Sequence, residues 1–343
     1  MAKININTQL FKLNREFIGL ESVKKKILVR SHIDTLKTSV ISKRDLNLLP
    51  ESEKIFISKW ETQNPIIEEI EVPVINSNPE KENLMKKHRY IVVDGIVEYS
   101  YRTKTDSSGK LLPKSERTHT DNVKTIFFEN TNEVYAIVYT GYYPNITRIK
   151  RIIGENNLDY TSSNYLISSD MFTWMFFKFS VFEGMLDCNL QLKNIAGFMG
   201  NITDEHNVFK GESQQTSELI ITKAFISNGE QIKDLIVRIK DEVVDATLRI
   251  NEFSNLNLNV RQSEIVGFFI GEDKNYFIPL YTYIYLIPKM LYLYNLDSDE
   301  FLKNDMKNFS AKIGEDVILS IIQKNGLKLE SLIEKLKTES VVV

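Results

Sequence analysis

The stretch Thr125–Glu155 has the clearest pattern of hydrophobic and polar positions in the chain. Two short runs rich in β-branched and aromatic residues flank a polar connection of four residues, which is typical of a β-hairpin. The runs are Ile126–Glu129 and Val134–Tyr139, and Asn130–Glu133 joins them. This stretch therefore predicts two neighbouring antiparallel strands.

A helix is predicted directly after this hairpin. Its isoleucines recur at spacings of three and four, which places them on one buried face. Asn145 is the expected N-cap and Gly154 the expected end of the helix. Lys150 and Arg151 should face solvent, with Arg148 nearby. The isoleucines concerned are Ile146, Ile149, Ile152 and Ile153.

The N-terminal part of the chain shows a second helical pattern. Aliphatic residues between Leu20 and Val40 recur at spacings of three and four, with a gap near Arg30. This spacing predicts an amphipathic helix or a pair of helices. Leu48–Trp60 is expected to form a further short helix, because its Pro-Glu pair suits a first turn.

Strands and loops are predicted between these helices and the first hairpin. Arg89–Tyr101 consists of two β-rich runs around Asp94-Gly95, a pair preferred by type I′ turns, and predicts another hairpin. Ile66–Val74 lies between prolines and is read as an edge strand or an extended linker. Lys104–Asp121 is polar and is read as a long surface loop.

The second half changes from helical to β-type patterns. Asp170–Phe182 is apolar on nearly all sides and predicts a buried helix with Ser168 or Ser169 as N-cap. Short β-rich runs follow, separated by turn signals, which suits an antiparallel sheet or a partial barrel. Asp299–Lys337 then returns to a helical pattern. The β-rich runs are Ser217–Ile226, Leu235–Lys240, Val243–Ile250, Asn257–Val260, Ile265–Ile270 and Tyr276–Leu280.

Together these patterns predict an α+β fold. We expect an N-terminal helical segment plus a small α+β sheet layer, then a mainly antiparallel β domain with C-terminal helices. A length of 343 residues fits two or three domains. We place a basic helical segment at 1–62, an α+β domain at 63–184, and the antiparallel β domain with its C-terminal helices at 185–343.

Composition adds a charge asymmetry to this picture. Net charge is −3, but the first 46 residues hold ten basic and four acidic residues, against 33 and 42 in the remainder. The first 17 residues lack the apolar core of a secretion signal, and prolines and Lys289 interrupt the most apolar region, Tyr276–Leu296. We expect a cytoplasmic protein without membrane contact. Abundant Lys, Asn and Ile are typical of an AT-rich bacterial genome.

The sequence lacks the common catalytic and cofactor motifs. The sequence contains neither a P-loop nor a dinucleotide fingerprint, and it lacks a nucleophile elbow and a kinase catalytic loop. Its single cysteine excludes an intramolecular disulfide and a thiolate zinc cluster within one chain. The four histidines show no metal-ligand spacing. We therefore expect no cofactor and no metal, and the sequence argues against an enzyme.

Three isolated features could still carry chemistry. Glu272 and Lys274, with Asp245 upstream, resemble the carboxylate–lysine set of metal-dependent nucleases, but they fall in a predicted turn, so a solvated turn is favoured. Cys188 is expected to be buried and inert. His119 is expected to be a polar loop residue without a role in proton transfer.

His88 and a group of tyrosines each allow a structural and a functional interpretation. His88 lies in a run of charges that could contact phosphate, but a solvated charge run is the default. The alternating tyrosines Tyr281, Tyr283 and Tyr285 would share one face of a strand. An aromatic core or a protein interface explains them better than a platform for stacked bases.

Basic residues supply the remaining candidate site. They cluster on the N-terminal helix, before the predicted hairpin at 89–101, and on the helix after Pro144. If these clusters converged, they would form a groove for a phosphate backbone, although each run alone is more often a solvated face. The candidate residues are Lys24, Lys25, Lys26, Arg30, Lys87, Arg89, Arg148, Lys150 and Arg151.

Three functions from different classes follow. The first is a non-catalytic nucleic-acid-binding or regulatory protein that contacts DNA or RNA through its basic N-terminal half. The second is a protein–protein scaffold or a subunit of a larger assembly, of the kind that antiviral-defence and mobile-element loci encode, with a protein partner or a second copy of the chain. The third is a divergent metal-dependent nuclease.

Overall fold

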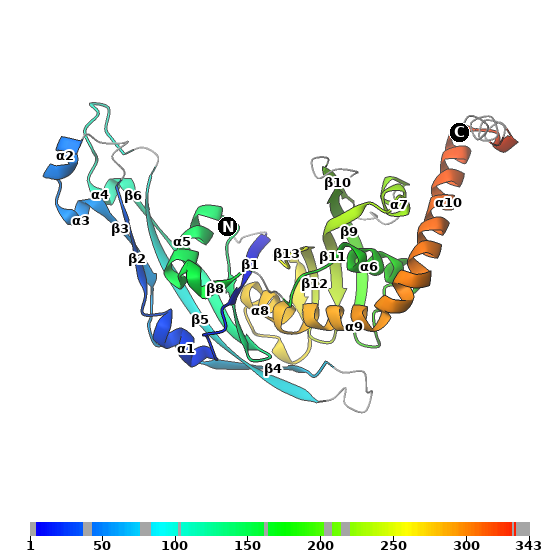
Figure 1. Cartoon of the computed structure of the whole chain (residues 1–343), viewed down its shortest axis with the longest axis horizontal. Coiled ribbons are helices and arrows are strands. Elements are labelled where there is room, and N and C mark those ends of the chain that lie inside the picture. The colour runs from blue at the N-terminus through cyan, green and yellow to red at the C-terminus, as the bar shows by residue number, and fades with distance from the viewer. Residues whose placement is uncertain are drawn as a thin grey trace. The chain divides into compact units, whose positions relative to one another are not determined.

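The computed structural model describes residues 5–36, 43–75, 84–101, 104–160, 164–201, 208–213, 220–330 and 333. The chain forms two compact units, and each mixes helices with antiparallel strands, which confirms the α+β class (Figure 1). Unit 1 consists of Met1–Tyr165, Asn255–Asn257 and Asn275–Leu286. Unit 2 consists of Leu166–Ser254, Leu258–Lys274 and Ile287–Val343.

Unit 1 is built on an antiparallel sheet whose centre is the long strand β5. β6 pairs with β5 along one side, while β3 and β4 pair with different parts of the other side. The two-residue strand β8, Leu158–Asp159, pairs with β1. The other strands, in spatial order, are β1 (Asn5–Leu13), β7 (Glu133–Val138), β6 (Thr118–Asn130), β5 (Met85–Ser100), β3 (Ile55–Trp60) and β2 (Ser31–Thr35), with β4 (Glu68–Pro73) beside β5.

The expected N-terminal helical segment is wrong. Helical spacing holds only for α1, Leu20–Lys26, because the backbone groups of the next segment pair with β3 as strand β2. Ile33, read as part of a helical stripe, points outward and is 54% exposed. Two further short helices, α2 (Lys43–Leu48) and α3 (Glu51–Lys54), precede β3. The single helix predicted over 48–60 is therefore wrong: the short helix α3 is followed directly by strand β3.

The predicted hairpin around Asp94-Gly95 is also wrong, because β5 runs straight through it. Gly95 serves close packing instead of a turn. A Cβ atom built at Gly95 would lie 2.4 Å from Ile149 Cδ1, in the helix above the sheet. The glycine therefore allows that helix to approach the strand closely.

The hairpin of β6 and β7 is confirmed. Thr131 and Asn132 both have positive φ values, 50° and 66°, as a type I′ turn requires. β6 begins at Thr118, so the loop expected over 104–121 is shorter than predicted and includes the short helix α4, Lys114–Arg117.

Helix α5, Tyr143–Ile153, follows this hairpin and covers the sheet as predicted. Its four isoleucines are buried against β3 and β5, and burial of each side chain contributes about 2 kcal/mol. Gly154 ends the helix with a φ of 95°. Asn145 is not the N-cap: the helix starts at Tyr143, and the Asn145 amide donates to Asp121.

The opposite face of the unit 1 sheet is aromatic. Tyr135 and Tyr139 lie there and pack against Tyr165 and against the segment 275–286. This segment is helical, not the strand predicted over 276–280: α8, Lys274–Tyr281, is followed by the π-helical turn η5, Thr282–Leu286. The tyrosines Tyr281, Tyr283 and Tyr285 are buried, so they belong to the core.

The strands of unit 2 are also antiparallel, and helices cover their apolar face. Helix α6, Ser169–Val181, packs against β9 and β11, and the Ser168 side chain caps it by accepting from the Met171 amide, as predicted. The strands in spatial order are β10 (Val208–Glu212), β9 (Gln191–Asn201), β11 (Gln231–Lys240), β12 (Val244–Asn251) and β13 (Leu256–Ile265).

The remaining helices of unit 2 differ partly from the prediction. The run read as a strand at 217–226 overlaps helix α7, Ile220–Ser227, and residues 267–269 form a 3₁₀ turn instead of a strand. The expected C-terminal helices are α9 (Ile287–Glu300) and α10 (Met306–Asn325), joined by the π-helical turn Phe301–Asp305. Most of the residues predicted as helical beyond 330 lie outside the described ranges.

None of the helices in the described part of the chain combines the length and the hydropathy that crossing a membrane would require.

Candidate functional site

A pocket of about 500 Å³ in unit 1 brings together residues from α5, β2, β3 and β5. Its wall contains three cations, two carboxylates and three aromatic rings, so it offers both charged groups and planar apolar surfaces. We call it the α5 pocket. The lining residues are Asp34, Thr35, Leu36, Phe56, Glu98, Tyr99, Ser100, Lys104, Tyr143, Pro144, Thr147, Arg148 and Arg151.

Arg148 is the central cation of the α5 pocket. Its guanidinium carbon lies 4.2 Å from the centroid of the Tyr99 ring, and Nη1 lies 3.4 Å from Asn145 Oδ1. Burial lowers the pKa of Arg148, yet a guanidinium stays charged at neutral pH. Within the described ranges, no carboxylate oxygen lies at ion-pair distance from Arg148. Its charge is therefore available to a ligand.

Arg151 stands one turn further along α5 and is already paired. Its Nη1 lies 3.0 and 3.2 Å from the two carboxylate oxygens of Asp34 in β2. His32 Nε2 also lies 3.5 Å from Asp34. The ion pair ties α5 to the edge strand and offsets part of the positive charge of the pocket.

A hydrogen-bonded cluster behind Arg148 fixes its position. Asp121 of β6 accepts from the Tyr99 hydroxyl at 2.9 Å and from Asn145 Nδ2 at 2.7 Å, and His119 Nε2 lies 2.7 Å from its other oxygen. Burial would raise the pKa of Asp121, but the bonds from Asn145 and Tyr99 outweigh it and lower the pKa. The Tyr101 hydroxyl lies 3.1 Å from His119 Nδ1.

The same contacts explain why Tyr99 is a neutral, fixed ring. Burial, together with the hydrogen bond to Asp121, raises the pKa of Tyr99 to about 12. The hydroxyl is therefore protonated at neutral pH and held in place. A ring fixed in this way keeps the guanidinium of Arg148 stacked on its face.

On the other wall of the pocket, the charge of Glu98 is balanced by neighbouring groups. Glu98 accepts from the Ile57 amide at 3.0 Å and lies 3.3 Å from Lys114 Nζ. Arg117, in the polar segment between β5 and β6, is completely buried and donates to Leu112 O and Glu53, which anchors this segment on α3. Lys104 has no carboxylate at ion-pair distance among the residues the structure describes.

Only two of the nine predicted basic residues, Arg148 and Arg151, line this pocket. Lys150 points elsewhere, over the rings of Phe11 and Tyr160 at 4.7 and 5.1 Å, and burial lowers its pKa. Arg30 lies beside Gly154, at the C-terminal end of α5. Helix α5 therefore divides its cations between two surfaces.

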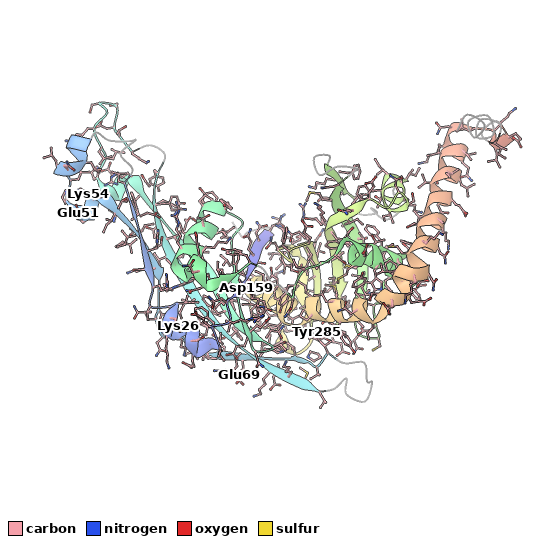
Figure 2. The ribbon with its side chains drawn as sticks, viewed as in Figure 1. Lys26, Glu51, Lys54, Glu69, Asp159 and Tyr285 are labelled. Carbon is pink, nitrogen blue, oxygen red and sulfur yellow. The ribbon has the colours of Figure 1, made fainter. Side chains whose placement is uncertain are left out.

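None of the three lysines of α1 lines the α5 pocket. Lys24 lies 3.9 Å from Glu21, and Lys26 lies 3.9 Å from Glu16 while also standing over the ring of Phe17. Lys25 is exposed. Figure 2 labels Lys26 on this helix.

The two predicted residues of β5 are held by carboxylates. Lys87 lies 3.2 Å from Glu69 and 3.6 Å from Glu71, both on the neighbouring strand β4 (Figure 2 labels Glu69). Arg89 lies 3.5 Å from Glu129, which also accepts from the Leu20 amide at the start of α1. Convergence of all nine cations into one nucleic-acid groove stays a prediction.

The other residues that the sequence offered as candidates for chemistry lie outside the α5 pocket. Asp245 is held by Arg238 at 2.6 and 2.9 Å, and Lys274 Nζ donates to two backbone carbonyls, so these side chains have structural partners. Cys188 is exposed, contrary to the prediction of a buried thiol. His88 is buried, not part of a solvated run, and burial lowers its pKa.

The described residues contain no group of three or more His, Cys, Asp and Glu side chains that could hold a metal ion. What the α5 pocket offers is one unpaired guanidinium, a second cation and aromatic rings. This combination binds anions and flat groups.

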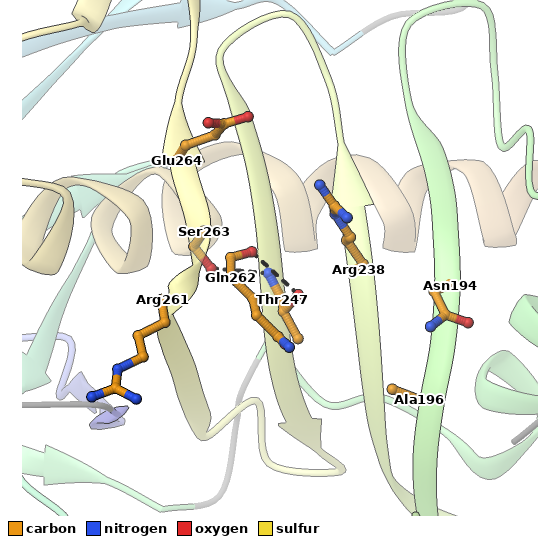
Figure 3. A pocket seen from close by; sticks show the side chains of 8 residues that line it. All are labelled: Asn194, Ala196, Arg238, Thr247, Arg261, Gln262, Ser263 and Glu264. Atoms are coloured by element: carbon orange, nitrogen blue, oxygen red, sulfur yellow. Dashed lines mark hydrogen bonds between the residues drawn. The ribbon is translucent and has the colours of Figure 1, made fainter. Parts of the chain in front are cut away.

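A second pocket, of about 430 Å³, lies on the polar face of the unit 2 sheet (Figure 3). Two of its side chains have structural partners: Arg238 pairs with Asp245, and Ser263 accepts from the Thr247 amide and donates to Asn259 O. These contacts link neighbouring strands. They explain this polar face as part of the sheet's own structure, which makes it a weaker candidate.

Sequence reasoning found Arg148 and Arg151 but missed the residues that position them. Tyr99 and Tyr101 alternate at the end of β5, and His119 and Asp121 alternate at the start of β6. Their two-residue spacing places all four on one face, and Tyr99 pairs with His119 across the strands. The signal was hidden because one strand was read as a hairpin and the other as a loop.

No protein-family model matches this sequence. No curated protein matches it either. Function is therefore argued from the geometry of the site.

Proposed function

We propose that this chain is a non-catalytic nucleic-acid-binding protein and that the α5 pocket contacts the phosphate backbone. The observation that carries the proposal is Arg148, a guanidinium stacked on Tyr99 with no carboxylate partner among the described residues. Guanidinium groups bind phosphate oxygens through paired hydrogen bonds.

The surroundings of Arg148 support binding without chemistry. Tyr99 is held neutral by Asp121, and the amide of Asn145 donates to the same carboxylate. These groups satisfy one another and fix the cation in place. Preorganisation of this kind lowers the cost of ordering a side chain on binding.

The test is a fluorescence anisotropy titration of labelled DNA and RNA across a series of salt concentrations. Arg148→Ala is expected to weaken binding about tenfold, which corresponds to ~1.4 kcal/mol, and to reduce the salt slope by about one. Arg15→Ala, a change of an exposed arginine outside the pocket, is the matched control. Absence of binding by the unaltered chain at low salt would refute the proposal, as would equal affinity of the Arg148 variant.

A protein partner is the second candidate, and helix α10 supports it. Ile318, Leu319 and Ile321 on this helix are 41–56% exposed. Exposed aliphatic residues grouped on one helix are typical of protein contacts. Light scattering coupled to size exclusion tests for a second copy, and Leu319→Lys is then expected to yield monomers.

A further inference from the structure

We infer that the nucleic acid taken by the α5 pocket is single-stranded, an inference that rests on the proposed function. It is carried by two observations: the scarcity of unpaired cations around the pocket, and an exposed aromatic ring in its wall.

Charge pairing argues against a duplex. Binding to double-stranded DNA depends on several lysines and arginines that neutralise successive phosphates. In the α5 pocket, Arg151 is already paired with Asp34. Arg148 and Lys104 are the pocket cations without such partners in the described ranges. Two cations suit a short stretch of backbone.

The exposed ring belongs to Tyr143, in the first turn of α5. It is 74% exposed and lines the same pocket as Arg148. Its backbone oxygen accepts from Thr147 Oγ1 at 3.1 Å, within the same helix. Nothing in this arrangement requires an aromatic side chain for packing. A flat ring beside a phosphate-binding cation offers a base a surface on which to stack.

Size leads to the same conclusion. A volume of about 500 Å³ lies in the range of pockets that take one small ligand. A duplex keeps its bases stacked inside, so its bases could not reach Tyr143. A single strand can turn one base onto the ring while the adjoining phosphate meets Arg148.

The experiment compares unlabelled single-stranded DNA, single-stranded RNA and double-stranded DNA of one sequence as competitors for a labelled single strand. Single strands are expected to compete at least tenfold better than the duplex. Tyr143→Ala is expected to weaken single-strand binding at least fivefold, while Tyr143→Phe keeps the ring and the affinity. Tyr160→Ala, at an exposed tyrosine outside the pocket lining, is the control.

The salt series separates the two proposals. Tyr143→Ala should leave the salt slope unchanged, because no phosphate contact is lost, whereas Arg148→Ala should reduce it. A duplex that competes equally well, or a Tyr143→Ala variant with full affinity, overturns the single-strand inference and leaves the proposed function standing. A chain that binds none of the three nucleic acids overturns both.

Discussion

At the scale of single residues, the position of α5 depends on Gly95. The glycine lies in the middle of β5, and a methyl group there would meet Ile149 Cδ1 at 2.4 Å. Ile152 Cδ1 and Trp60 Cζ3 would each lie 3.4 Å from the same methyl group, so the space is filled from several directions. Arg148 and Arg151 are carried by the same helix, so this contact also positions the candidate site.

We predict that Gly95→Ala lowers the free energy of unfolding by about 1–3 kcal/mol, because it overpacks the contact between strand and helix. Gly314→Ala in α10 is the comparison: its nearest atom beyond the helix is Ser227 Cβ at 3.5 Å, an ordinary contact, and alanine favours a helix. Urea unfolding measures both. Equal stability of the Gly95 variant and the unaltered chain would contradict the packing argument.

His88 gives a pH dependence at the same scale. Burial lowers its pKa below the ordinary value of 6.5, with a smaller opposing effect of Glu129 O at 3.3 Å. Below pH 6.5 the unfolded chain therefore binds more protons at this residue than the folded chain. Stability contributed by His88 is present above pH 6.5 and is lost as the pH falls from that value through the lower pKa of the folded state.

Replacing His88 with Gln tests this dependence. The difference in unfolding free energy between pH 7 and pH 5 should become smaller in His88→Gln than in the unaltered chain. Denaturant titrations at both pH values provide the measurement. A larger difference in the variant would show that the sign assigned to His88 is wrong.

At the scale of elements, the predictions that were confirmed rest on local sequence signals such as caps and turn residues. Ser168 has the side chain and the position of an N-cap, and α6 begins directly after it. Thr131 and Asn132 form the turn that the polar connection indicated. Around Gly95 a local signal failed, because Asp-Gly also suits a strand that a helix approaches closely, and the sequence does not show what lies above the strand.

Helix α6 provides a test at this scale. Ser168→Ala removes the oxygen that accepts from the Met171 amide at 3.2 Å, and should cost about 1 kcal/mol of stability. Ser168→Asp restores an acceptor and should recover most of that loss. Thermal unfolding measures both variants, and an alanine variant as stable as the aspartate variant would argue against the cap.

At the scale of the whole molecule, unit 1 is discontinuous in sequence. Tyr283 belongs to it although the chain reaches this residue only after much of unit 2: its hydroxyl lies 3.0 Å from Thr8 Oγ1, and its carbonyl accepts from Tyr165. Alternating tyrosines resembled a strand because π-helical geometry and burial on all sides erase the helical period. Only the contacts across the unit reveal their role.

The candidate site could be predicted only in part from the sequence. Arg148 and Arg151 could be found as basic residues on a reliable helix. The carboxylates that neutralise other predicted cations could not be found: Asp34 lies on β2, in a segment that was read as a helix. Tyr99 and Asp121 meet across two strands, and such a pair depends on register, which single-sequence patterns do not fix.

The most direct measurement of the central claim is hydrogen–deuterium exchange of the full chain with and without a single-stranded oligonucleotide. Binding at the α5 pocket should slow exchange in peptides that cover α5 and the end of β5, with the polar face of β11 and β12 unchanged. The Arg148→Ala variant should show weaker protection at the same oligonucleotide concentration. Protection confined to other elements, or none at a concentration that saturates binding, would contradict the assignment of the α5 pocket as the nucleic-acid site.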